Sequence, residues 1–292
     1  MPAAFVTGGA QGIGRGCAMA LAAEGYSVLV CDLERQRVGG EATAAAVKAS
    51  AAAVSSGGSA QFVACDVTDT ESLAAAIASC AELFGEEISA SVAVVGGGPD
   101  GARAPLLEQS AASYFGTIAL TQHATFFQTQ YSAQAMVRGG KGGSIVIIGS
   151  IMADMAAPTG GAYSMAKCAI RQLGKTAAAE LAPHKIRVNV VQPGYIDTPG
   201  ERQVRERCLL FGCAVLLLFV LRLIRETPLV QVASEEEIKN SSMCIPLQRM
   251  GTPEDIGNMV AFLCLPKASY VTGSVRLHVA RPAVIPLEVR IF

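Results

Sequence analysis

The stretch "AAFVTGGAQGIGRGCAMALAAEG", residues 3–25, decides the fold. It opens with an apolar run of strand length, and its second half carries Ile13, Cys17 and Leu21 at intervals of four, as in an amphipathic helix that ends at a glycine. Between the two halves lies "TGGAQGIG", residues 7–14. A strand, a glycine-rich turn and a helix in direct succession predict the start of a βαβ unit, and therefore a parallel sheet.

The rest of the chain continues this alternation of short apolar runs and longer alanine-rich stretches. Strands are expected over 3–7, 27–31, 61–65, 90–95, 144–149, 186–191 and 274–279. Helices are expected over 12–25, 70–83, 110–137, 163–181 and 253–264, and over 41–59 as a helix that decays into a Ser/Gly loop. The pattern predicts one α/β domain over residues 1–292, a doubly wound, Rossmann-like parallel sheet of seven strands with helices on both faces.

Composition excludes several classes of function. The 23 Lys and Arg residues balance 24 Asp and Glu, so no net field would gather nucleic acid or anionic lipid, and we expect no nucleic-acid partner. The nine cysteines are scattered, with no C-x-x-C pair, and favour buried thiols in a reducing compartment over disulfides or a metal site. The N-terminus lacks a basic region followed by an apolar core, so we expect a cytoplasmic protein.

The glycine-rich turn has the features of a phosphate-binding site. Gly8 permits a tight turn, Gly12 lets the backbone approach a ligand closely, and Gly14 allows the helix to pack on the strand. Unpaired N–H groups and the helix dipole would face a pyrophosphate. Such a turn can also be a plain strand-to-helix connection, so the context must decide.

Asp32 supplies that context. It follows the second expected strand, about twenty residues after the glycines, where a carboxylate binds the adenosine ribose and repels a 2'-phosphate. This favours NAD, although nearby basic residues keep NADP possible: Arg15, Arg35 and Arg37. Asp66 and Val67, at the end of the third expected strand, would line the adenine, or on their own form a helix cap.

The segment "GAYSMAKCAI", residues 161–170, places Tyr163 and Lys167 one helical turn apart. An adjacent ammonium lowers the pKa of a phenol from about 10, so that the ring oxygen can exchange a proton with an alcohol or a carbonyl. Ser150 stands at the carboxyl end of an expected strand, where ligands bind in open α/β sheets, and its hydroxyl could hold the same oxygen. Taken singly, these residues could equally be a half-buried tyrosine, a solvated lysine and a turn serine.

Together and in this order, "TGGAQGIG", Asp32, "CDV", Ser150, "YSMAK" and "QPGYIDT" resemble the short-chain dehydrogenase/reductase family in its compact single-domain form. The resemblance spans residues 3–200 and resumes over 246–275. It implies hydride transfer between a nicotinamide and a secondary alcohol or its ketone. Tyr163 would be the acid/base, Lys167 would bind the nicotinamide ribose and lower the tyrosine pKa, and Ser150 would polarise the carbonyl.

The resemblance also implies a cofactor, NAD with NADP possible, a small-molecule substrate, and a homo-oligomer, either a dimer or a tetramer. The implied cofactor-binding residues are Gly8, Gln11, Gly12, Ile13, Gly14, Asp32, Leu33, Asp66, Val67, Gly96, Tyr163, Lys167, Pro193, Gly194, Ile196 and Thr198.

Two departures from the family pattern lie close to the expected site. Where the family usually has an asparagine that supports a water-mediated proton path, this chain has Thr121, which lacks the amide. Where the family commonly reads Asn-Asn-Ala-Gly, this chain has "VVGGG", residues 94–98. The glycines keep the close backbone approach but lose the side-chain hydrogen bonds that stiffen the turn.

A third departure is the apolar segment 204–231, where the family has a loop that covers the substrate. Its uncharged core, residues 209–221, would span about 20 Å as a helix, short of the ~30 Å of a bilayer. Three interpretations stay open: a buried or oligomer-facing lid helix, an interfacial membrane helix, or translated non-coding sequence. The C-terminal tail, residues 276–292, also lacks the Asp-Gly-Gly turn expected of the family.

These departures leave a second function open, a catalytically impaired dinucleotide-binding sensor or scaffold. A membrane-surface protein that uses residues 208–224 is a third, although we expect no membrane partner. The intact Ser150, Tyr163 and Lys167 favour the enzyme.

Overall fold

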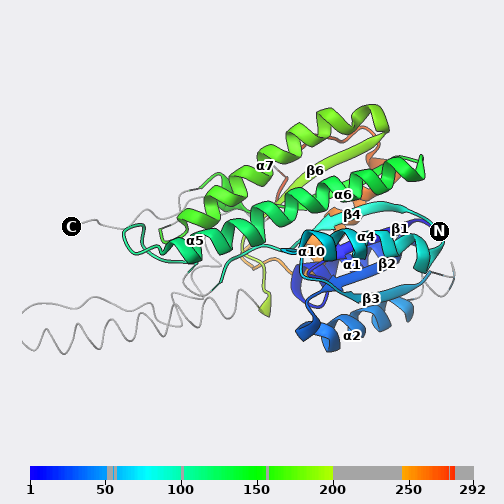
Figure 1. The fold of residues 1–292 in the computed structure, drawn as a ribbon, viewed down its shortest axis with the longest axis horizontal. Helices are drawn as coiled ribbons and strands as arrows, with labels where there is room; N and C mark the ends of the chain where they lie inside the picture. The colour runs from blue at the N-terminus through cyan, green and yellow to red at the C-terminus, as the bar shows by residue number, and fades with distance from the viewer. Residues whose placement is uncertain are drawn as a thin grey trace, which may run out of the picture.

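Seven parallel strands form a single sheet in the computed structural model, which describes residues 1–50, 55, 58–99, 102–155, 158–199, 245–275 and 277–279. The strands are β1 Ala3–Thr7, β2 Ser27–Asp32, β3 Ala60–Ala64, β4 Ile88–Ala93, β5 Gly143–Ile148, β6 Ile186–Pro193 and β7 Leu277–Val279. Their order is β3-β2-β1-β4-β5-β6-β7, so the winding reverses between β1 and β4 (Figure 1). The predicted doubly wound, seven-stranded sheet is confirmed.

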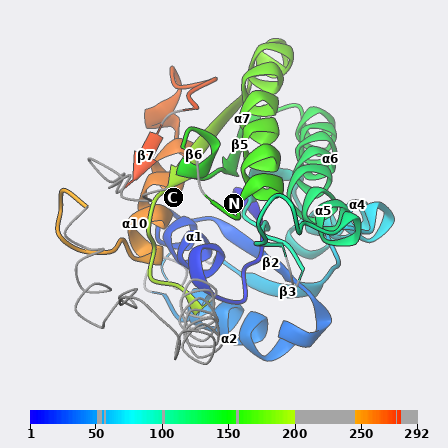
Figure 2. The same cartoon turned by 90° about the vertical axis from the view of Figure 1, so that its left-hand side faces the viewer.

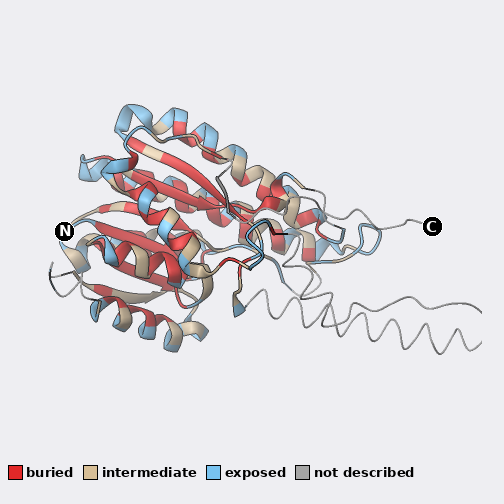
Figure 3. Ribbon diagram, turned by 180° about the vertical axis from the view of Figure 1, so that it is seen from behind, coloured by how far each residue is buried: buried red, intermediate tan, exposed pale blue. Residues whose placement is uncertain are grey.

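Helices cover both faces of this sheet (Figure 2). One face carries α1 Gly12–Ala23, α2 Arg37–Lys48 and α10 Pro253–Cys264, and the other carries α4 Thr70–Phe84, α6 Ala124–Gly139 and α7 Gly161–Leu181. Successive strand residues point to opposite faces, so Val6 packs with the first group of helices and Phe5 with the second. Figure 3 shows the result, buried strands between helices whose outer sides are exposed.

The start of α10 is set by local chemistry that the sequence shows directly. The Thr252 hydroxyl accepts a hydrogen bond from the Asp255 N–H at 3.3 Å, and the Asp255 carboxylate accepts one from the Thr252 N–H at 2.8 Å. Pro253 occupies the first turn, where a missing N–H costs nothing. This capping box explains why the helix begins at Pro253, and the helix has the expected bounds, 253–264.

The expected helix over 110–137 is interrupted, which corrects the prediction. It consists of α5 Ala111–Ile118, a π-helical segment Ala119–His123, and α6. The Ala124 N–H bonds to the Ala119 carbonyl five residues back, and threonine hydroxyls bond to carbonyls of the preceding turn, as Thr125 does to Thr121 at 2.7 Å. Such backbone bonding by threonine favours local distortion of a helix, and π-bulges concentrate at functional sites.

Other expectations are refined or fall outside the described residues. Strand β7 is Leu277–Val279, shorter than the expected 274–279. The segment 204–231 lies outside the described residues, as does the tail 276–292 except for β7.

The six described cysteines are free, and all but Cys168 are buried. Among the described helices, none has the length and apolarity needed to span a membrane.

Helices α1 and α10 approach each other through two glycines. A Cβ added at Gly257 would lie 2.4 Å from the Gly16 carbonyl oxygen, and one added at Gly16 would lie 2.3 Å from the Pro253 carbonyl oxygen. Both contacts are with backbone, which cannot yield without moving a helix. Helix α1, which follows the glycine-rich turn, is therefore anchored to α10, more than two hundred residues away in the sequence.

Gly257→Ala is expected to destabilise the protein by about 1–3 kcal/mol, because the methyl group forces α1 and α10 apart. Gly161→Ala is the matched control, since a Cβ there meets no atom of the described part of the chain within 4 Å. Thermal and denaturant unfolding of both variants measure the difference. Equal midpoints for the two variants would contradict the close packing described above.

Candidate active site

The carboxyl ends of β1, β2, β4, β5 and β6 meet at one edge of the sheet, the edge that faces the viewer in Figure 2. In open α/β sheets ligands bind at this edge, beside the point where the winding reverses. Here that point lies between β1 and β4. Every site residue expected from the sequence lies at or just after the end of one of these strands or of β3, or on a helix packed beside them.

The glycine-rich turn forms a cradle with little room for side chains. Gly8 adopts a φ of +64°, a left-handed conformation that favours glycine, and a Cβ at Gly14 would lie 2.0 Å from the Gly8 carbonyl oxygen. Gln11 at the N-cap makes no side-chain capping bond, so the first N–H groups of α1 lack that partner. This combination fits a pyrophosphate group bound at the helix N-terminus.

The two halves of the expected cofactor site come together at this turn. A Cβ added at Gly12 would lie 3.4 Å from the Thr198 side chain, so the segment after β6 packs against the glycines. Gln11 is exposed, so its amide and its backbone are both open to a ligand, while Ile13 is half-buried against the core. The structure thus places Gly12 of the turn beside Thr198.

Asp32 is tied to the same turn. Its carboxylate accepts hydrogen bonds from the N–H of Ala10 at 3.1 Å and from the N–H of the half-buried Leu33 at 2.8 Å. The sequence suggested only a ribose-binding acid, whereas the structure shows that the carboxylate also holds the glycine-rich turn against the end of β2. A carboxylate has lone pairs enough for these two donors and for further ones.

Arg37, one of the three arginines that could recognise a 2'-phosphate, is engaged elsewhere. Arg37 bonds to Glu34 at 2.6 Å and to Glu41 at 3.1 Å, and its guanidinium lies 5.3 Å from the centre of the Phe62 ring. The two carboxylates raise the pKa of this guanidinium and lower the local positive potential. Arg37 therefore offers less to a second phosphate than its position in the sequence suggests.

Asp66 and Val67 are placed differently from each other. Asp66 is exposed, and its carboxylate accepts hydrogen bonds from the N–H and the hydroxyl of Thr68 at 2.9 and 2.7 Å. Val67 is buried in the core beneath α4. The residue that caps α4 is Asp69, so the helix-cap interpretation of Asp66 and Val67 is wrong by three residues.

Lys167 is the most constrained charged residue of the site. Its side chain is 2% exposed, and Nζ donates a hydrogen bond of 2.7 Å to the Ile148 carbonyl at the end of β5. The same Nζ lies 5.6 Å from the centre of the Tyr163 ring and would lie 2.9 Å from a Cβ at Gly96. Burial lowers the pKa of Lys167 to about 7, because a charged ammonium is costly without water.

Ser150 and Tyr163 lie on neighbouring elements. Ser150 is 9% exposed, directly after β5, and its hydroxyl oxygen accepts a hydrogen bond from the Met152 N–H at 3.2 Å. The half-buried Tyr163 lies in the first turn of α7, which packs against the short 3-10 helix Ile151–Ala153. The serine's own proton is left for an acceptor, since Met152 supplies the hydrogen of the bond they share.

Thr121 supports the turn that the sequence suggested was weakened. It is fully buried in the π-helical segment, and its hydroxyl both accepts a hydrogen bond from the Gly97 N–H and donates one to the Gly97 carbonyl, each at 2.9 Å. The run 96–98 is therefore not without stiffening side-chain bonds, which corrects that expectation. One residue from α5–α6 replaces what the family obtains within the turn itself.

The segment after β6 is fixed by its backbone. Ile196 forms a bridge with Gly251, and its side chain is buried in the core, so only its backbone remains for a ligand. The Asp197 N–H bonds to the Gly251 carbonyl at 2.9 Å. Pro193 is buried at the end of β6 and Gly194 is half-buried, which places the segment at the same edge as Ser150.

A buried polar contact beneath the site was not found from the sequence. The Thr7 hydroxyl donates a hydrogen bond to Gln128 Oε1 at 2.9 Å and accepts one from the Val94 N–H at 3.2 Å. Gln128 Nε2 donates to the Val92 carbonyl at 3.1 Å. This glutamine of α6 joins the ends of β1 and β4, and a polar residue on an inward helical face was its only signal in the sequence.

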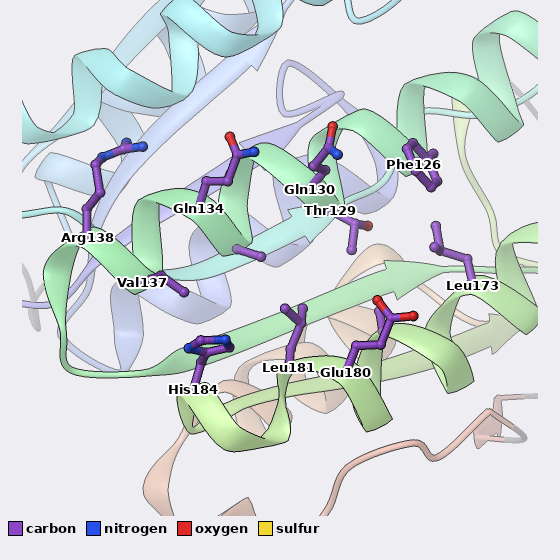
Figure 4. Close-up of a pocket in the computed structure, with 12 residues that line it drawn as sticks. Phe126, Thr129, Gln130, Gln134, Val137, Arg138, Leu173, Glu180, Leu181 and His184 are labelled. Atoms are coloured by element: carbon purple, nitrogen blue, oxygen red, sulfur yellow. The ribbon is translucent and has the colours of Figure 1, made fainter.

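A groove runs between α6 and α7, apart from the expected site residues (Figure 4). Its wall includes the apolar side chains of Phe126, Leu173 and Leu181, and polar ones such as Arg138 and Glu180. None of the predicted catalytic or cofactor-binding residues lines it.

The buried amine predicts a specific dependence of stability on pH. The unfolded lysine keeps its proton up to about pH 10.5 and the folded one loses it near pH 7. Between these values the unfolded state binds more protons, so the free energy of unfolding of the wild type, relative to Lys167→Met, should rise with pH by a few kcal/mol, at ~1.4 kcal/mol per pKa unit.

Denaturant unfolding at intervals from pH 7 to 10 measures this difference, because other titrations cancel between the two proteins. Lys175→Met, an exposed position on the same helix, is the control and should show no such trend. A difference between wild type and Lys167→Met that stays constant over this range would refute the burial of the amine.

Comparisons with known proteins agree with this geometry. The family model described as "short chain dehydrogenase" matches residues 2–209, and one described as "Enoyl-(Acyl carrier protein) reductase" matches residues 223–279. An L-2,3-butanediol dehydrogenase of Corynebacterium glutamicum is 34% identical over 94% of this chain and 95% of its own. A human (3R)-3-hydroxyacyl-CoA dehydrogenase is 30% identical over 93% of this chain and 91% of its own.

The fold has matches among solved structures as well. A short-chain type dehydrogenase/reductase from Mycobacterium ulcerans superposes with a TM-score of 0.76 at 29% identity, covering 94% of this chain and 86% of that one. The sequence matches and the fold agree on one assignment. This chain is an oxidoreductase of the short-chain dehydrogenase/reductase family.

Proposed function

We propose that the protein interconverts a secondary alcohol and its ketone by hydride transfer with a nicotinamide dinucleotide, with Tyr163 as the acid/base. The observation that carries this proposal is the buried Lys167, whose Nζ lies between the end of β5, Gly96 and the Tyr163 ring. In its protonated form, the Lys167 amine would favour the phenolate over the phenol, as the chemistry requires.

The chain offers a complete set of groups for the dinucleotide. The cradle of Gly8, Gly12 and Gly14 suits the pyrophosphate, Asp32 suits the adenosine ribose, and Lys167 suits the nicotinamide ribose. The remaining expected contacts, from Leu33, Asp66, Val67 and the segment 193–198, belong to the same proposal. When bound there, the nicotinamide ring supplies or accepts the hydride.

The residues of the chain handle the proton. During reduction of a ketone, the Tyr163 hydroxyl would transfer its proton to the carbonyl oxygen as the carbon gains the hydride, and in oxidation the phenolate would take that proton back. Ser150 would donate a hydrogen bond to the same oxygen, since its hydroxyl already accepts one from Met152. Thr121 would keep the 96–98 turn in place rather than take part in proton transfer.

Two of the relatives suggest the chemical class of the substrate. The names of the Corynebacterium and human relatives describe a small vicinal diol and an acyl-CoA thioester with a 3-hydroxyl group. Both are secondary alcohols, which is the class proposed here. The catalytically impaired sensor or scaffold is the alternative, supported by the altered residues Thr121 and 96–98.

Tyr163→Phe is expected to lower the rate of ketone reduction by about 10²–10⁴-fold, because the ring keeps its shape but loses the hydroxyl group that would transfer the proton. NADH oxidation followed at 340 nm across a panel of ketones and diketones measures the rate, and NADH fluorescence measures binding, which should persist. Tyr131→Phe, which alters a tyrosine stacked on Phe127 in α6, is the control with unchanged rate. Tight NADH binding by the wild type with no turnover across the panel would favour the sensor.

The cofactor is proposed to be NAD rather than NADP. Asp32 carries a negative charge beside the turn, and Arg37 is held by Glu34 and Glu41. A 2'-phosphate would therefore meet repulsion from Asp32, with Arg37 already paired.

Asp32→Asn is expected to raise the ratio of kcat/KM with NADPH to kcat/KM with NADH by about tenfold, the effect of ~1.4 kcal/mol of lost repulsion. It should also reduce stability slightly, because an amide group cannot accept from both Ala10 and Leu33 N–H groups as the carboxylate does. Glu86→Gln, remote from the turn, is the control. An unchanged cofactor ratio would argue against Asp32 as the discriminating residue.

The assembly and the location of the protein are part of the same proposal. The groove between α6 and α7 exposes apolar side chains, among them Phe126 and Val137, which a second copy related by a two-fold axis could cover (Figure 4). A homo-oligomer, dimer or tetramer, is therefore proposed. The free, mostly buried thiols of the described region suit a cytoplasmic protein.

A further inference from the structure

The segment that carries Ser150 is held by α7 at several points. Lys167 Nζ donates to the Ile148 carbonyl at 2.7 Å, and the Cys168 thiol donates to the Ala153 carbonyl at 2.9 Å. Arg171, one turn further along α7, forms an ion pair with Asp154. The helix that carries Tyr163 therefore contacts the segment both before and after Ser150.

Strand β6 holds the same segment from the other side through Gln192. This side chain is fully buried, and its Nε2 donates hydrogen bonds to the Ser150 carbonyl at 3.0 Å and to Asp154 Oδ2 at 3.1 Å. Its Cγ packs on Gly149, where an added Cβ would lie only 3.1 Å away. The amide thus fixes the backbone of Ser150, while the serine hydroxyl stays with Met152.

Asp154 is the residue that joins these two sides. One carboxylate oxygen accepts from Gln192 of β6 and the other pairs with Arg171 of α7. The side chains of Asp154 and Arg171 are 18% and 25% exposed, although Asp154 as a residue is exposed. A charge-assisted bond in such surroundings holds its geometry better than a solvated ion pair. Gln192 Oε1 is buried and has no hydrogen-bond partner among the residues that the structure describes, so within these residues the orientation of the amide is determined by its two acceptors.

We propose that Asp154 is a positioning residue for the reaction, which, with Arg171 and Gln192, fixes the distance and direction of Ser150 relative to Tyr163. Asp154 does not touch the reacting atoms and acts through Ser150. The inference rests on the proposed function, because it assigns a role within that same site. A displacement of about 1 Å at a group that orients the substrate can cost up to 10²-fold in rate, which is the scale of effect expected here.

Asp154→Asn is the main test, because it keeps the size of the side chain and an oxygen for Gln192 but removes the charge that holds Arg171. The expected result is a kcat lowered about 10- to 100-fold, with the NADH dissociation constant and the thermal midpoint close to those of the wild type. Arg171→Met should lower kcat similarly, and Arg171→Lys should restore part of the loss. Glu87→Gln, which breaks the surface ion pair with Arg138, is the control with unchanged kcat.

A double variant separates positioning from general damage. If Asp154 acts through Ser150, then adding Asp154→Asn to Ser150→Ala should lower kcat by no more than about twofold further. A further loss as large as in the wild-type background would overturn the proposal, as would a normal kcat for Asp154→Asn alone.

Different results would overturn the proposed function and the role of Asp154. Wild-type protein that binds NADH but turns over no substrate of the panel would overturn the proposed function and this role with it. Wild-type turnover that is insensitive to Asp154→Asn and Arg171→Met would overturn only the role of Asp154.

Discussion

One interaction organises the site, the hydrogen bond from the buried Lys167 ammonium group to the Ile148 carbonyl at the end of β5. An isolated cation in a dry environment is costly, so it persists only where the surrounding elements determine its position. Here a helix, a strand end and the glycines after β4 all meet at Nζ. The proposed chemistry depends on this placement, because the same cation lies beside the Tyr163 ring.

The support for this arrangement comes from side chains that no ligand would touch. Gln128 joins the ends of β1 and β4, Thr121 holds Gly97, and Asp154 connects α7 to β6. Each is a polar group whose hydrogen bonds are completed inside the protein, and such networks define geometry more narrowly than apolar packing does. They also explain how the chain can differ from its family at residues 96–98 and retain an ordered turn.

Much of the fold could be predicted because its signals are local. Apolar runs marked the strands to within a few residues, and the capping box of Thr252 and Asp255 set the start of α10. The π-helical interruption at 119–123 escaped prediction, since it depends on where the Thr121 hydroxyl finds a partner in another element. The N-cap of α4 was predicted at Asp66 and Val67 but is Asp69. The choice between Asp66 and Asp69 depends on the path of the chain between them, which the residue types do not fix.

By itself, the sequence determined the order of strands and helices along the chain and the glycine-rich turn, and it pointed to Ser150, Tyr163 and Lys167 as the proposed reactive residues, because periodicity and short motifs lie in adjacent residues. Only the tertiary structure decided the burial of Lys167, the second role of Asp32 in holding the turn, and the connection of Asp154 to both Gln192 and Arg171. These features join residues far apart in the chain, and their energies depend on the solvent that folding removes, which no local pattern records.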